Sequence, residues 1–120
     1  MGAAQEELGI STDFRLALPA NPGVESVDLC VILGNLLENA LNACAAQTKG
    51  KKFIRTLAKV EGMEILICVE NSYDSTIEYS NHEGLGIPSV NTIAGKYGGV
   101  ASFERKDKQF CASVLLYKTE

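Results

Sequence analysis

Apolar positions along residues 28–44 predict one long amphipathic helix. They recur at steps of three and four, so they share one face: Leu29, Leu33, Leu36, Ala40 and Cys44. Three asparagines, Asn35, Asn39 and Asn42, fall on another face, within a stripe of roughly 60°. Asparagine is a middling helix former, so repeating it adds no helix stability. The stripe indicates either a solvated face or a site that binds through amide oxygens and donors.

The remaining chain alternates in ways that predict strands and one more helix. Strands are expected over 13–19, 51–60, 63–71, 100–105 and 109–117, with turns at 61–62 and 106–108. A second helix is marked by Ile87, Val90, Ile93 and Ala94, with Pro88 in its first turn. It ends at Lys96-Tyr97-Gly98-Gly99. Residues 72–83 predict a long loop of the kind that often forms a lid.

The expected order is β-α-β-β-loop-α-β-β, which predicts an α+β fold. We expect a two-layer α/β sandwich with a mixed, mostly antiparallel sheet and helices on one face. Residues 13–120 are expected to form one domain, and residues 1–12 are interpreted as a tail or as the remnant of a preceding segment.

Two local features could bind a ligand. Asn71 continues the apolar row Met63, Ile65, Ile67 and Val69, so it is either a turn residue or a partner for a base edge. Gly84-Leu85-Gly86 opens the second helix, as a tight turn or as a backbone approach to phosphates. Rossmann and P-loop patterns are both missing from the sequence.

Composition excludes some functions. A net charge of −4 argues against a nucleic-acid-binding surface. The apolar runs are short and interrupted, and the N-terminus lacks a signal-peptide pattern, so no membrane-spanning segment is expected. The four cysteines, Cys30, Cys44, Cys68 and Cys111, form no CxxC pair. We interpret them as buried, reduced thiols of a cytosolic protein.

Together, these motifs resemble a known superfamily. Asn35-Leu36-Leu37-Glu38-Asn39-Ala40 resembles the N box of GHKL proteins, which include gyrase-type topoisomerases, MutL proteins, heat-shock chaperones and sensor histidine kinases. Gly84-Leu85-Gly86-Ile87 resembles their glycine-rich G2 box. Lys96-Tyr97-Gly98-Gly99 before two strands is similar to the histidine kinase continuation. The resemblance covers residues 13–117 and implies the Bergerat ATPase fold, with ATP and Mg²⁺ bound.

The resemblance implies a role for individual residues on the long helix. Asn39 would be the magnesium ligand. Asn35 would lie beside the phosphates in the catalytic position, where gyrase-type members carry the Glu that activates water. Asn42 matches a nucleotide-binding position that is often Lys or Arg in the kinases.

The adenine site departs from the usual pattern. Asn71 falls where most members have the Asp of a DxGxG motif, and the chain reads Asn71-Ser72-Tyr73-Asp74 without its glycines. This departure is similar to the Agr-type quorum-sensing kinases, and either Asn71 or Asp74 would contact adenine. The resemblance adds Gly84, Leu85, Gly86 and Ile87 as nucleotide-binding residues.

The function that the resemblance implies is that of the ATP-binding catalytic domain of a two-component sensor histidine kinase. It would donate the γ-phosphoryl group to a histidine in a separate dimerisation domain, with a response regulator as the indirect partner. The fragment would bind ATP with little turnover. The whole protein would be a homodimeric plasma-membrane receptor with this domain in the cytoplasm.

Two alternatives stay open. The missing glycines and the uncharged Asn42 favour a degenerate GHKL module that acts in protein interaction. An anti-sigma-factor-type serine kinase needs no histidine helix. His82 precedes Glu83 as in a phosphoacceptor pair, but it lies in the loop, so we interpret it as a loop or lid residue. The acceptor helix would precede residue 1.

Overall fold

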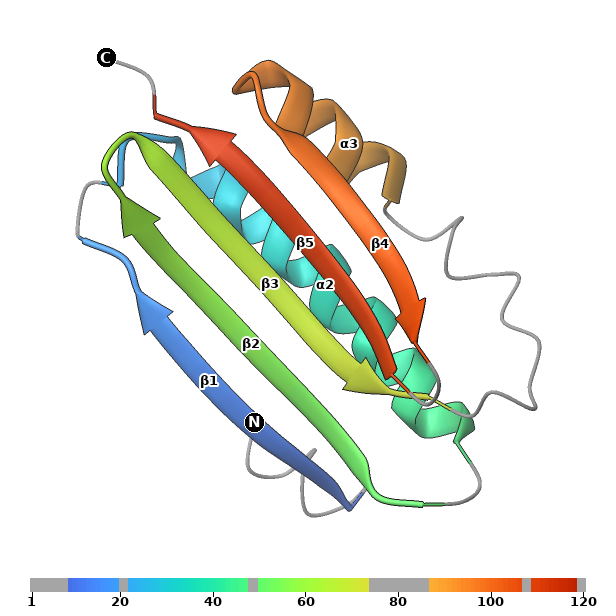
Figure 1. Cartoon of the computed structure of the whole chain (residues 1–120). Coiled ribbons are helices and arrows are strands. Elements are labelled where there is room, and N and C mark those ends of the chain that lie inside the picture. The colour runs from blue at the N-terminus through green and yellow to red at the C-terminus, as the bar shows by residue number, and fades with distance from the viewer. Residues whose placement is uncertain (1–8, 20–21, 48–49, 74–86, 107–108, 119–120) are drawn as a thin grey trace.

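The computed structural model describes residues 9–19, 22–47, 50–73, 87–106 and 109–118. Its elements follow the predicted order (Figure 1). They are β1 (Ile10–Ala17), α2 (Ser26–Ala46), β2 (Lys52–Glu61), β3 (Glu64–Ser72), α3 (Ile87–Lys96), β4 (Val100–Lys106) and β5 (Gln109–Tyr117).

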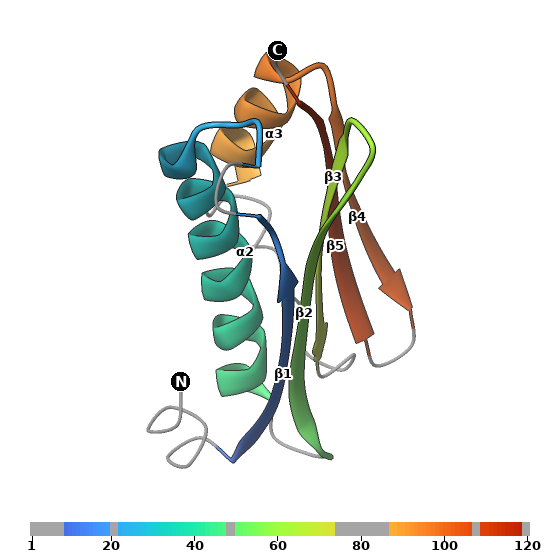
Figure 2. The ribbon, with the colours of Figure 1, turned by 90° about the vertical axis from the view of Figure 1, so that its left-hand side faces the viewer.

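The strands form one sheet in the order β1-β2-β3-β5-β4. β1 runs parallel to β2, and every other neighbouring pair is antiparallel. Both helices cover the same face of this sheet (Figure 2). The predicted α+β, two-layer arrangement is therefore confirmed.

The core lies between α2 and the centre of the sheet. The helix buries Leu29, Ile32, Leu36, Ala40 and Cys44. The alternating rows predicted for β2 and β3 supply the facing side chains, Ile54, Ala58, Ile65, Ile67 and Val69. By length and composition, α2 could also cross a membrane. In this fold its apolar side packs against the sheet, as expected for an amphipathic helix that covers a core.

Several boundaries differ from the sequence-based expectation. β1 begins at Ile10, before the predicted start at residue 13, because Ile10 is only 1% exposed and pairs with Lys52. The turn between β2 and β3 is one residue later than predicted, since Glu61 pairs with Glu64. Gly62, with φ of 59°, therefore opens the turn. A left-handed backbone there is easiest for glycine.

A polar cluster joins the start of α2 to the end of α3. The Asp28 carboxylate accepts hydrogen bonds from Lys96 Nζ at 2.8 Å and from Tyr97 Oη at 2.5 Å. Tyr97 Oη in turn accepts the Glu25 N–H at 3.1 Å. Lys96, and then Tyr97, hold the pKa of Asp28 below its usual value. The cluster therefore fixes α3 against α2.

The expectation of four buried thiols is right only for Cys44. Cys30 is exposed on α2, and Cys68 and Cys111 are half-buried. Strand side chains alternate between the two sides of the sheet, so the apolar neighbours of Cys68 and Cys111 in sequence lie on the opposite face. Cys30 lies on the side of α2 that faces away from the core.

Candidate functional site

The asparagine stripe of α2 runs from the core to the solvent. Asn39 is 6% exposed, Asn35 is half-buried and Asn42 is exposed. A fully solvated face is therefore wrong for Asn39. Its Oδ1 is buried and has no hydrogen-bond partner among the described residues. A buried polar atom without a partner costs stability, so it calls for an explanation.

Asn71 lies inside β3, not in a turn. It is 3% exposed and stands between Ile54 of β2 and Phe110 of β5. Its Nδ2 donates to the Ser72 carbonyl at 2.9 Å. This bond uses the donor end of the amide and orients the side chain.

The second half of α2 reaches the sheet near Asn71. The Cys44 thiol donates to the Phe53 carbonyl at 3.5 Å and lies 3.6 Å from Ser72 Oγ. Burial raises the pKa of Cys44. Because Ser72 follows Asn71, the last turns of α2 and the end of β3 occupy the same end of the molecule (Figure 1).

A pocket of about 270 Å³ opens at the β4–β5 hairpin. Its described lining is Ile87, Phe103, Arg105 and Phe110. The rings of Phe103 and Phe110 stack with centroids 6.4 Å apart, and Phe110 is the β5 neighbour of Asn71. One lining residue is therefore the strand neighbour of Asn71, and another, Ile87, is the first residue of α3.

Sequence reasoning missed three of these pocket residues, Phe103, Arg105 and Phe110. One signal could have found Arg105, since it continues the row of Ala101 and Phe103 on alternate positions of β4. Asn71 continues an apolar row of β3 in the same way. Of the predicted binding residues in the G2 box, Ile87 is described and buried. Asp74, Gly84, Leu85 and Gly86, as well as His82, lie outside the described residues.

One atom of the described residues, the amide oxygen of Asn39, is suited to bind a hard cation. The amide oxygen of Asn39 is a ligand type that Mg²⁺ accepts, and coordination would satisfy its unpartnered Oδ1. Within the described ranges, no group of three His, Cys, Asp or Glu side chains could hold a metal.

Comparison with known proteins identifies the family. The GHKL domain profile matches residues 24–117. The sensor histidine kinase DpiB of Escherichia coli (strain K12) is 24% identical, over 72% of this chain and 18% of DpiB. The chain therefore spans less than a fifth of that curated relative.

Solved histidine kinase structures share the fold. A nucleotide-free catalytic domain of histidine kinase ThkA superposes with a TM-score of 0.74 at 17% identity, covering 99% of this chain and 87% of ThkA. The mycobacterial sensor histidine kinase MprB gives 0.64 at 12% identity, covering 98% and 90%. Full-length ShkA in complex with AMPPNP gives 0.66 at 17% identity, covering 100% and 28%. With the family profile spanning most of the residues, the chain belongs to the GHKL domain family, with the fold of histidine kinase catalytic domains.

Proposed function

We propose that this GHKL domain binds ATP with Mg²⁺ and serves as the catalytic domain of a sensor histidine kinase. The observation that carries the proposal is the buried Oδ1 of Asn39 on the N-box helix, which has no hydrogen-bond partner in the described part of the chain. A buried amide oxygen without a partner lowers the stability of the unliganded domain. It gains a partner when a cation binds, which explains why an asparagine stands at this position.

The adenine end of the ligand would lie in the pocket beside Asn71. Phe103 and Phe110 offer an apolar lining, which suits the faces of a base. Asn71 uses its Nδ2 on the Ser72 carbonyl, so its Oδ1 is the end suited to accept the adenine amino group. Asp74 is the alternative contact.

The phosphates would extend toward α2 and the start of α3. Asn35, one turn before Asn39 and half-buried, would donate its amide to a phosphate oxygen. Gly84, Leu85, Gly86 and Ile87 would supply backbone N–H groups as α3 begins. Asn42 is exposed, so it would reach the phosphates only from the rim.

Catalysis in this proposal is positioning. A magnesium ion bound with the nucleotide would neutralise phosphate charge. The residues of the chain hold the triphosphate so that the acceptor imidazole can approach in line with the leaving oxygen. An asparagine at position 35 has no basic group to activate water, which favours transfer to a protein over hydrolysis.

The acceptor and the rest of the receptor are proposed for the whole protein. A histidine on a separate dimerisation domain would take the phosphoryl group and pass it to a response regulator. We place this domain in the cytoplasm, as part of a membrane-bound homodimer, and assign it to the Agr-type subgroup on the resemblance at Asn71-Ser72-Tyr73-Asp74.

A degenerate module that acts in protein interaction is the second candidate. It is favoured by the exposed, uncharged Asn42 and by the missing glycines after Asn71. It predicts that the domain has no measurable affinity for nucleotide.

Calorimetry with ATP and ADP, each with and without Mg²⁺, separates the two candidates. We expect binding that strengthens with Mg²⁺, and we expect Asn39→Ala to remove most of that magnesium-dependent gain while keeping weaker, metal-independent binding. An absence of binding at millimolar nucleotide in the wild-type domain would overturn the proposal in favour of the degenerate module.

A further inference from the structure

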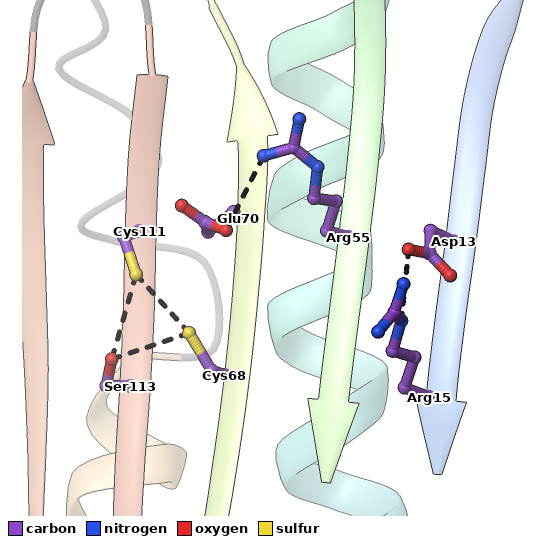
Figure 3. Close-up of polar contacts among 7 residues, drawn as sticks. All are labelled: Asp13, Arg15, Arg55, Cys68, Glu70, Cys111 and Ser113. Atoms are coloured by element: carbon purple, nitrogen blue, oxygen red, sulfur yellow. Dashed lines mark hydrogen bonds and ion pairs between the residues drawn. The ribbon is translucent and has the colours of Figure 1, made fainter.

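The sheet face opposite the helices carries a close pair of thiols. Cys68 on β3 and Cys111 on β5 place their Sγ atoms 3.4 Å apart (Figure 3). Both side chains are half-buried and reduced, so a small reagent can reach them. Ser113 Oγ lies 3.7 Å from each sulfur.

The register explains why these two sulfurs meet. Cys68 lies opposite Ser113, and Cys111 lies opposite Glu70, so the cysteines are diagonal neighbours on adjacent strands. Diagonal side chains in an antiparallel pair can touch when they lean toward each other. β3 and β5 are interior strands of the sheet, so neighbours on both sides hold this spacing.

The surroundings of Cys68 favour its protonated form. Burial is the main reason that the pKa of Cys68 is raised to about 11, and proximity to Cys111 and Glu70 acts in the same direction. Cys68 therefore keeps its proton and can donate it toward the Cys111 sulfur. Glu70 is paired with Arg55 at 3.8 Å, which moderates its negative charge beside the thiols.

We propose that Cys68 and Cys111 form a thiol-oxidation site that closes to an intramolecular disulfide when a hydroperoxide is the oxidant. This site lies on the open face of the sheet and does not depend on the proposed nucleotide chemistry.

The reaction has two balanced steps. The Cys111 sulfur attacks one peroxide oxygen, the O–O bond breaks, and a sulfenic acid forms. One proton passes to the departing oxygen, which leaves as an alcohol or as water. The Cys68 sulfur then attacks the sulfenic sulfur, loses its proton, and expels the hydroxyl as water. Two electrons pass to the peroxide, and two thiols become one disulfide.

The test uses the full 120-residue chain with Cys30→Ser, because Cys30 is exposed and could link two molecules. Hydrogen peroxide is added, free thiols are alkylated, and tryptic peptides are mapped without reduction. Trypsin separates Cys68 in peptide 60–96 from Cys111 in peptide 109–118, and Cys44 stays in peptide 16–49. We expect a link between the first two peptides and a loss of about 2 Da in the intact chain, for the two hydrogens removed.

Two further variants make the result specific. In Cys68→Ser, the sulfenic acid on Cys111 has no resolving thiol, so we expect addition of oxygen in place of the link. In Cys111→Ser, the link should be lost as well. Because either variant could fold poorly, alkylation is also followed in the Cys30→Ser chain alone. There, both cysteines should lose reactivity in parallel, and a reductant should restore both. Oxygen addition to Cys111 without the link, or loss of reactivity at one cysteine only, would overturn the proposal.

Discussion

Replacing Asn39 with leucine should stabilise the domain and weaken nucleotide binding at the same time. Leucine has the same number and branching of side-chain heavy atoms as asparagine, although its two methyl groups are bulkier than the amide oxygen and nitrogen. It removes the buried Oδ1 that has no partner among the described residues. If that oxygen is kept for a ligand, its removal helps the unliganded protein and harms the complex.

The expected gain follows from the burial of this atom. Leaving a buried acceptor unpaired costs about 1–3 kcal/mol, and a carbonyl-type oxygen tends toward the lower end of such costs. Leucine is also a better helix former than asparagine, by roughly 0.5 kcal/mol. We expect a net stabilisation of about 1.5 kcal/mol, which for a domain of this size raises Tm by roughly 6 °C.

Thermal and urea unfolding of the unliganded protein measure this gain, and calorimetry with ATP and Mg²⁺ measures the loss of affinity. Asn91→Leu is the matched control, because Asn91 is exposed on α3. Its change in Tm measures only the contribution of helix propensity to stability. A Tm for Asn39→Leu at or below that of Asn91→Leu would refute the reasoning, since it would mean that the Asn39 amide already has its partners.

Two other predictions concern stability. Gly99→Ala should lose about 3 kcal/mol in urea unfolding, because its Cβ would lie 1.7 Å from the Leu115 carbonyl oxygen. Gly95→Ala meets nothing within 4 Å and should gain about 1 kcal/mol in helix propensity. Equal effects at the two glycines would contradict the close approach of the Gly98-Gly99 turn to β5. Asp28→Asn should lower Tm at pH 7. Because folding lowers the pKa of Asp28, the wild-type advantage should be full above about pH 4, the unfolded value, and should vanish as pH falls through the lower folded value. A difference in Tm that does not shrink as the pH is lowered below about 4 would show that the Asp28–Lys96 contact is not ionic.

Local patterning predicted the elements well, because their faces are set by periodicity. The row of Ile65, Ile67 and Val69 and the apolar stripe of α2 each alternate with the period of their element, so their burial could be predicted without a tertiary structure. The residues at which the elements begin and end were harder to predict. The start of β1 at Ile10 depends on pairing with β2, which is distant in sequence.

The candidate site was predicted only where its residues interrupt a pattern. Asn71 and the stripe containing Asn39 stand out as amides in apolar surroundings. Phe103 and Phe110 do not, because aromatic residues are ordinary in strands and their stacking depends on the β4–β5 register. The tie from Asp28 to Lys96 and Tyr97 joins segments 68 and 69 residues apart, so no local pattern predicts it.

Alternation along β3 and β5 has a consequence for both faces of the sheet. Asn71 and Phe110 point to the helical side, while Cys68 and Cys111 point to the open side. The same two strands, paired at nine positions, therefore present amide and aromatic side chains on one face of the sheet and thiols on the other. A ligand beside Asn71 and a reagent at the thiols would therefore contact the same two strands from opposite sides.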